Sequence, residues 1–184
     1  YLFALEKEGR AVFGQEIVPA GVLYLPARDV LVSKPRSVAA ESLRSALDKE
    51  LRRSGLVLSR PEVLRAMEHG ALEEPRFLPL ALGRGGGITG GLATAEELGK
   101  LGKLVNGMLE TIAGELRGGV IDADPCYVSE SDNACTYCEF ASACHFTDGE
   151  GGDRCKPLRP VKPEEFWGRI DMLIGGEETP WASN

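Results

Sequence analysis

The chain has 184 residues, 43% of them hydrophobic, with 21 basic and 28 acidic side chains and a net charge of −7. This length suffices for one domain that buries about 70% of its unfolded surface, and the acidic balance argues against a free-standing nucleic-acid-binding protein. No apolar run approaches the ~20 residues that span a bilayer, no signal peptide is recognisable, and the cysteines are odd in number and clustered, so we expect a cytoplasmic protein. The chain begins at Tyr1, inside what reads as a helix. We therefore expect it to be a piece of a longer protein.

Apolar spacing and turn residues predict a succession of helices and short strands. We expect helices over residues 1–8, 37–53, 59–69, 94–117 and 163–174, and strands within 18–26 and 76–82. Gly9 is placed to end the first helix, and Thr94 and Glu97 form a capping box at the start of the longest one. In that helix, apolar side chains three or four residues apart predict a continuous buried stripe: Leu98, Leu101, Val105, Met108, Ile112 and Leu116.

Residues 83–91 are the most glycine-dense stretch of the chain. They lack the Gly-Lys-Ser/Thr ending of a phosphate-binding loop. We predict a flexible turn or a partly disordered loop there.

The segment Arg28–Arg60 has a local excess of positive charge, with eight basic residues against four acidic ones, a net of +4. Such a run is more often a solvated helix face than a binding surface. If it faces DNA, Arg52 and Arg53 are the candidate phosphate contacts. A smaller basic cluster follows the last cysteine: Arg154, Lys156, Arg159 and Lys162.

All five cysteines lie in the last third of the chain. Cys135, Cys138 and Cys144 have C-x2-C-x5-C spacing, with Cys126 before them and Cys155 after them. A C-x2-C turn lets two thiolates converge on one centre, and a third thiol a short turn later supplies a further ligand. The spacing therefore predicts a metal centre rather than a set of small buried hydrophobic residues.

Thiolates select zinc or an iron–sulfur cluster, and the spacing leaves both open. Structural zinc sites usually have two cysteine pairs, or one cysteine pair and a histidine pair, whereas here one pair is followed by a single thiol and then by His145. Small and aromatic residues between the thiols are expected to shield a redox-sensitive cluster from water, which favours iron–sulfur. They are Tyr137, Phe140, Ala141, Ala143 and Phe146.

Three stretches together resemble a known family: the opening Tyr1–Gly9, the segment Ile17–Asp29 and the cysteine run Asp132–Phe146. They resemble the C-terminal end of AddB, the family of B subunits of the bacterial ATP-dependent helicase–nucleases that process double-strand DNA ends. The resemblance extends over nearly the whole chain. It implies that Cys135, Cys138 and Cys144 hold a [4Fe–4S] cluster whose fourth ligand lies far upstream of this chain. We predict that neither Cys126 nor Cys155 is a ligand, although Cys126 is the only nearby candidate for the fourth position within the chain.

The same resemblance implies the fold class. We expect an α/β (α+β) chain, mostly helical, that forms the C-terminal portion of a PD-(D/E)XK nuclease domain. Residues 1–125 would belong to the nuclease domain with a helical extension, 126–160 to the iron–sulfur segment, and 161–184 to a terminal helix and a disordered tail. Tyr1 resembles the tyrosine of the Gln-x-x-x-Tyr motif of these nucleases, although it reads almost equally well as a residue of a simple amphipathic helix.

No catalytic residue is predicted within the chain. Cleavage in this superfamily needs an Asp and an Asp/Glu-x-Lys that hold Mg²⁺ and activate water. Asp29 has no such partner, and Asp122 and Asp124 are expected to be turn residues. The resemblance places the Mg²⁺ site upstream, so we predict that the chain alone is inactive. The whole protein is expected to be the B subunit of an ATP-dependent DNA exonuclease, which acts on double-strand ends with its partner A subunit in recombinational repair.

Two alternatives stay open. One is a non-catalytic, zinc-stapled interaction module, and the other is a different RecB-like iron–sulfur nuclease, such as a CRISPR-associated exonuclease. The segment Ile17–Asp29 and the long insertion before Pro125 favour AddB. We expect a cluster here to stabilise the domain rather than to transfer electrons, because nuclease chemistry needs no electron.

Overall fold

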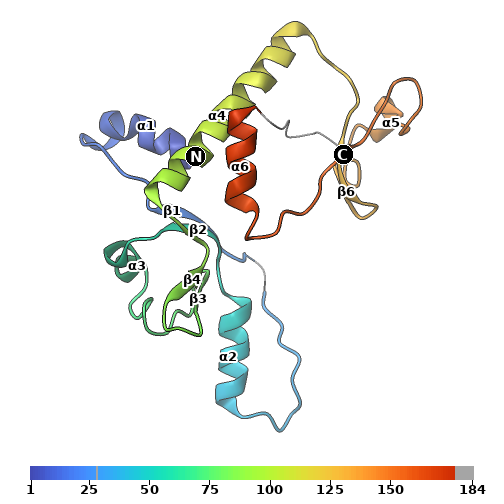
Figure 1. Cartoon of the computed structure of the whole chain (residues 1–184). Coiled ribbons are helices and arrows are strands. Elements are labelled where there is room, and N and C mark those ends of the chain that lie inside the picture. Colours follow the sequence, from blue (N-terminus) through green and yellow to red (C-terminus); the bar gives the residue numbers. More distant parts are fainter. Residues whose placement is uncertain (28, 177–184) are drawn as a thin grey trace. The chain divides into compact units, whose positions relative to one another are not determined.

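The computed structural model of the chain describes residues 1–27 and 29–176 (Figure 1). In this part of the chain six α-helices alternate with short strands in small sheets, so the prediction of a mixed α/β chain is confirmed. The chain divides into two compact units, which we call unit 1 (Tyr1–Gly99) and unit 2 (Lys100–Asn184). The predictions for Arg28 and for the tail 177–184 lie outside the described residues.

Unit 1 is built on a three-stranded sheet of β1 (Gly21–Tyr24), β2 (Ser54–Leu58) and β5 (Leu92–Ala93). β2 is the middle strand, antiparallel to β1 and parallel to β5. The sequence patterns do not predict β2, because it is short and directly follows a helical pattern. Its Val57 and Leu58 are nonetheless among the most buried side chains, at 0% and 3% exposed. Burial between two neighbouring strands, rather than local propensity, makes this segment a strand.

The glycine-dense stretch is more ordered than the sequence suggests. Gly83 and Gly87 close the predicted turn, with the Gly83 N–H donating to the Gly87 carbonyl at 2.7 Å. That turn connects β3 (Leu80–Leu82) to β4 (Ile88–Gly90), so the prediction of a flexible or disordered loop is wrong for residues 88–90. Gly90 has φ +119°, and a Cβ there would lie 2.3 Å from the Pro79 carbonyl oxygen. Glycine is needed at this position for close backbone approach and not for mobility.

Three helices belong to unit 1: α1 (Leu2–Phe13), α2 (Ala40–Glu50) and α3 (Pro61–Met67). α3 lies within the predicted helix 59–69 and has Pro61 in its first turn. The predicted end of α1 is wrong, because the helix continues past Gly9 to a left-handed cap at Gly14, with φ 73°. Gly9 is buried, and a Cβ there would lie 2.4 Å from Cγ1 of Ile17. It therefore provides room for a packed side chain instead of ending the helix.

The core of unit 1 lies between the sheet, α3 and the segment that follows α3. Its buried members are Val57, Leu64, Ala71, Leu78 and Leu80. The Glu68 carboxylate, just after α3, accepts the backbone N–H groups of three consecutive residues, Arg76, Phe77 and Leu78, at 2.6–3.3 Å. One side chain thus fixes the loop that carries Leu78 into the core.

The longest helix, α4 (Ala95–Gly118), begins at the predicted capping box. The Thr94 N–H donates to Glu97 Oε2 at 2.7 Å, and the Glu97 N–H donates to Thr94 Oγ1 at 3.1 Å. The predicted buried stripe holds only for the first turns. Leu98 is 3% exposed, but Ile112 and Leu116 are 43% and 72% exposed, because α4 extends beyond the described elements that cover it.

Unit 2 contains a second three-stranded sheet in the order β7 (Asp132–Asn133), β6 (Cys126–Ser129), β8 (Lys156–Pro157). β6 is antiparallel to β7 and parallel to β8. The helices α5 (Ala141–Cys144) and α6 (Phe166–Gly175) follow β7 and β8 in the chain. α6 confirms the predicted last helix, with Ile170 buried and a left-handed cap at Gly176.

Within unit 2, Lys100 of α4 and Asp171 of α6 form an ion pair at 2.9 Å. In the described part of the chain, no helix combines the length and the apolar character needed to cross a membrane.

Candidate metal centre

The predicted cluster ligands lie on the segment that leaves β7 and ends with α5. Asn133, the last residue of β7, anchors this segment. Its Oδ1 accepts the Cys135 N–H at 3.0 Å, and its Nδ2 donates to the carbonyls of Ser129 and Glu130 at 3.1 and 2.9 Å. The Asn133 side chain therefore closes the β6–β7 hairpin and fixes the point at which the first thiol leaves the sheet.

Two short turns carry the three thiols. The Cys138 N–H donates to the Cys135 carbonyl at 3.2 Å, so the C-x2-C pair brackets one turn. Cys144 ends α5, where its N–H donates to the Phe140 carbonyl at 2.9 Å, and His145 follows in the left-handed region with φ 52°. All three thiols are exposed and none is in a disulfide.

The structure does not gather the three predicted ligands at one point. Among residues 1–27 and 29–176, no three thiol, imidazole or carboxylate groups are close enough together to hold one metal ion. Cys135 instead shares an open pocket of about 410 Å³ with Cys155. The remaining lining residues of this pocket are Pro125, Tyr127, Asn133, Phe146 and Asp148.

Cys155 is held beside this pocket by Asp148, whose Oδ1 accepts the Cys155 N–H at 2.8 Å. Partial burial raises the pKa of the Cys155 thiol, and the negative charge of Asp148 raises it further, with a smaller contribution from Cys135. The expectation that Cys155 is not a ligand stays a prediction.

The donor set matches a thiolate-bound centre in its chemistry. Three free thiols on adjacent turns supply three of the four ligands that zinc and [4Fe–4S] sites use. Binding all three to one centre requires the segment 135–144 to close from the arrangement described here. A fourth ligand has to come from another residue.

The aromatic residues between the thiols differ from expectation. Tyr137 and Phe140 are 91% and 73% exposed, so they do not form a cover over the thiols in this structure. Phe146 is partly buried and lines the pocket shared by Cys135 and Cys155. The expected shielding of a cluster by Tyr137 and Phe140 is therefore absent from the described arrangement.

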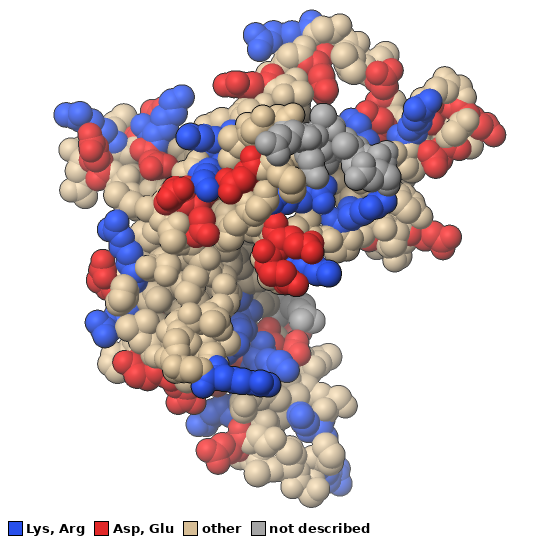
Figure 2. Space-filling model, in the orientation of Figure 1, with Lys and Arg blue, Asp and Glu red and all other residues tan. Residues whose placement is uncertain are grey.

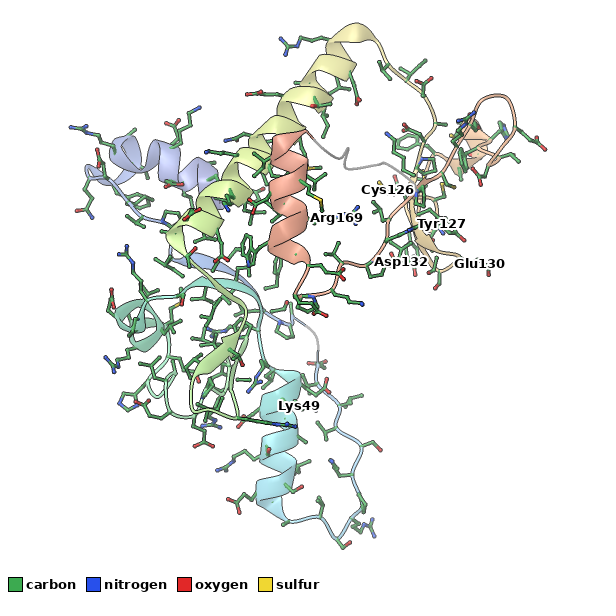
Figure 3. The ribbon with its side chains drawn as sticks, viewed as in Figure 1. Lys49, Cys126, Tyr127, Glu130, Asp132 and Arg169 are labelled. Atoms are coloured by element: carbon green, nitrogen blue, oxygen red, sulfur yellow. The ribbon has the colours of Figure 1, made fainter. Side chains whose placement is uncertain are left out.

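Cys126 lies on β6 and is partly buried (Figure 3). Beside it, Lys156 of β8 forms an ion pair with Asp124. The hydrogen bond to Asp124 is the main cause that raises the pKa of Lys156. Asp124, expected to be a turn residue, thus also secures β8 against the segment that precedes β6. The sequence gives no local signal for this pairing, since 32 positions separate the two residues.

One arginine of the basic segment, Arg52, is engaged in internal contacts. The Arg52 guanidinium donates to the carbonyls of Pro75 and Arg76 at 3.0 and 3.4 Å, and the Arg76 guanidinium pairs with Asp48 of α2 at 2.5 Å. These contacts tie the end of α2 to the loop before β3. On the face seen in Figure 2, basic side chains are interspersed with acidic ones. Arg52 is therefore better explained as a structural residue on a solvated face than as a phosphate contact.

Comparison with known proteins finds relatives that share one name. No family model matches the chain. The chain is 30% identical over 162 residues to the B subunit of the ATP-dependent helicase/deoxyribonuclease of Thermoanaerobacter sp. (strain X514), which covers 86% of the chain and 14% of that protein. It is 29% identical over 183 residues to the protein of the same name from Clostridium perfringens (strain SM101 / Type A), covering 96% and 16%. The Acetivibrio thermocellus protein of this name is 28% identical over 169 residues, covering 91% and 15%.

All three relatives have the same name, that of a B subunit of an ATP-dependent helicase/deoxyribonuclease. More particularly, the chain is homologous to the B subunits of these helicase/deoxyribonucleases, and the resemblance to AddB predicted from its sequence is confirmed. The chain spans about 14–16% of the length of these relatives.

Proposed function

We propose that the chain is part of a helicase–nuclease B subunit that, together with the A subunit, degrades DNA from double-strand ends for recombinational repair. The observation that carries the proposal is the similarity to proteins of that name over 86–96% of the chain. In this role the chain forms the C-terminal portion of a PD-(D/E)XK nuclease domain. The carboxylates and the lysine that bind Mg²⁺ and activate water belong to another part of the protein.

The proposal includes a [4Fe–4S] cluster ligated by Cys135, Cys138 and Cys144. Support comes from the C-x2-C-x5-C spacing, from the two adjacent turns that present the thiols, and from their exposure to solvent. The fourth ligand comes from a distant part of the longer protein. A centre bound in this way crosslinks the thiol segment to that part and stabilises the nuclease domain, much as a disulfide restricts the unfolded chain.

The ligand set is tested by metal analysis of the whole protein that contains this chain, purified without oxygen. Each of the five cysteines is replaced by alanine in turn, and iron and acid-labile sulfide are measured per protein. We expect Cys135→Ala, Cys138→Ala and Cys144→Ala to lose iron, while Cys126→Ala and Cys155→Ala keep it. Loss of iron in Cys126→Ala with retention in Cys144→Ala would show that the ligand set is wrong. Stoichiometric zinc without sulfide would instead favour the zinc-stapled module.

The nuclease assignment is tested by comparing the isolated chain with the whole protein on linear duplex DNA and Mg²⁺. We expect cleavage by the whole protein and none by the chain alone. Robust Mg²⁺-dependent cleavage by the purified chain would place the active site within residues 1–184 and overturn this part of the proposal.

A further inference from the structure

The thiol segment of unit 2 presents two large aromatic side chains to solvent. Tyr137 is 91% exposed and Phe140 is 73% exposed. Aromatic rings are usually buried or engaged at an interface, because each removes a large apolar surface from water. Two exposed rings three residues apart on one loop supply two flat, apolar surfaces on which a ligand can stack.

A uniformly basic segment lies in the same unit. Residues 154–162, which we call the basic strap, read Arg-Cys-Lys-Pro-Leu-Arg-Pro-Val-Lys and contain four basic residues and no acidic one. This composition contrasts with a chain that has 28 acidic and 21 basic residues. Such a local concentration of positive charge supplies the cations that a phosphate-binding surface needs.

The basic strap is held extended against the second sheet. The Lys156 N–H donates to the Pro125 carbonyl at 2.8 Å, and the Leu158 N–H donates to the Tyr127 carbonyl at 2.7 Å. Pro157 and Pro160 fix two further backbone angles. Residues 156–158 of the strap therefore have a fixed course beside β6, and the exposed cations Arg154 and Lys162 precede and follow this bonded part in the chain.

The cations at the two ends of the strap are accessible. Lys156 is engaged by Asp124, but Arg154 and Lys162 are exposed. Lys162 has a 3.9 Å contact with Glu165, and both side chains are more than 60% exposed. Such an exposed pair contributes little energy and does not prevent Lys162 from meeting a phosphate.

The pocket shared by Cys135 and Cys155 connects the two features. Tyr137 follows Cys135 by two residues, and Arg154 directly precedes Cys155. The acidic residues Glu130 and Asp132 lie at the tip of the β6–β7 hairpin, at the opposite end from Cys126 (Figure 3). Cys135 at the start of the aromatic loop and Cys155 in the strap thus line the same pocket, together with the carboxylate of Asp148.

We infer that Tyr137, Phe140 and the basic strap bind single-stranded DNA, with bases stacked on the two rings and phosphates beside Arg154 and Lys162. Stacking surfaces combined with cations are the usual means of binding single strands without reading their sequence. The inference rests on the proposed function, because a helicase–nuclease that unwinds a DNA end generates single strands.

The aromatic contribution is tested by fluorescence anisotropy, with the whole protein purified without oxygen and a fluorescein-labelled oligothymidylate. Tyr137→Ala/Phe140→Ala is expected to weaken binding by about tenfold or more, with iron content unchanged. Tyr137→Trp/Phe140→Trp is expected to retain binding, because tryptophan also stacks. Unchanged affinity in the alanine variant would overturn the inference. Loss of iron in that variant would also overturn it, because the rings would then serve as a cover for the cluster.

The charge contribution is tested by the salt dependence of the same binding reaction. Arg154→Gln/Lys162→Gln removes two phosphate contacts, so the slope of log K against log salt is expected to become shallower by about 1.4. Lys103→Gln, an exposed lysine of α4, is the matched control and is expected to leave affinity and slope unchanged. Tyr137→Ala/Phe140→Ala should lower affinity without changing the slope. An unchanged slope in Arg154→Gln/Lys162→Gln would show that the basic strap does not contact phosphates.

The two proposals fail separately in these experiments. If the whole protein has its iron and cleaves duplex ends while the aromatic and strap variants bind oligothymidylate normally, the further inference is wrong and the proposed function stands. If the unmodified protein does not cleave DNA, the proposed function fails. Capture of a protein by the exposed rings without effect on oligothymidylate binding would count against the inference.

Discussion

Unit 1 is held together by a hydrophobic core, whereas the thiol-bearing sheet of unit 2 is held by polar contacts. Of the nine buried hydrophobic residues in the described part of the chain, eight lie in unit 1, and the ninth, Ile170, is on α6. Between Cys126 and Pro157 no described residue is buried. There the contacts are strand hydrogen bonds, the Asn133 and Asp148 side chains and the Lys156–Asp124 pair.

This difference in hydrophobic burial between the two regions indicates where an added crosslink stabilises the fold most. A small segment that buries little apolar surface does not offset the entropy of ordering its backbone, and such segments commonly depend on a metal or disulfides. Unit 1 has no such need, because its core supplies the driving force. The proposed cluster ligands lie in the region that lacks a core.

The largest expected effect is the loss of a proposed ligand. In the whole protein, Cys138→Ala should remove the centre and with it stabilisation on the order of 5 kcal/mol, if the centre closes a long loop as a disulfide would. Limited proteolysis should then cut the nuclease domain faster, and nuclease activity and DNA-end binding should fall together. Cys155→Ala is the control and should resemble the unmodified protein. Equal protease resistance with lost activity would instead indicate a direct functional role for the centre.

A core substitution should have its effect in unit 1. Leu78 is fully buried, at 0% exposed, so Leu78→Ala is expected to cost roughly 2–5 kcal/mol through lost burial and the cavity left behind. Leu116→Ala removes the same atoms from a side chain that is 72% exposed, and is expected to stay within about 0.5 kcal/mol of the unmodified chain. Urea denaturation measures both. Similar losses for the two variants would contradict the location of the core.

The carboxylate of Glu68 tests whether a polar contact supports that core. Glu68→Gln keeps the shape of the side chain but leaves one oxygen in place of two, so fewer N–H groups of residues 76–78 are satisfied. We expect a cost of roughly 1–2 kcal/mol in urea denaturation. Glu73→Gln, on an exposed neighbour, serves as the control with little change. A stability of Glu68→Gln equal to that of the control would show that the loop needs no carboxylate.

The smallest expected effect is a gain in stability in α4. At Gly99, Gly107 and Gly114 a Cβ would meet no atom within 4 Å, so alanine should stabilise the helix by about 0.5–1 kcal/mol per position. Gly9→Ala in α1 is the matched contrast, because its Cβ would lie 2.4 Å from Cγ1 of Ile17. Thermal unfolding should show a rise for the α4 variants and a fall for Gly9→Ala. A lower unfolding temperature in all four variants would mean that other atoms pack against α4 at these three glycines.

Local signals in the sequence were sufficient for several elements and for the resemblance to the relatives. The capping box at Thr94, the first-turn proline of α3 and the apolar face of α6 each act within one or two helical turns, so their consequences do not depend on the rest of the chain. The thiol spacing and the flanking residues likewise indicated a thiolate-bound centre and the resemblance to AddB, and the relatives confirm that resemblance.

Contacts between distant residues decided the rest. β2 became the central strand because it pairs with β1 and β5, and Gly9 and Gly90 are glycines because Ile17 and the Pro79 carbonyl lie against them. Cys155 and Cys135 line the same pocket, and the Arg52 guanidinium donates hydrogen bonds to the carbonyls of Pro75 and Arg76. A local pattern reports which face of an element is apolar. The partner of a strand, a glycine or a charged side chain is set by chain segments tens of residues away, and only the tertiary structure brings these together.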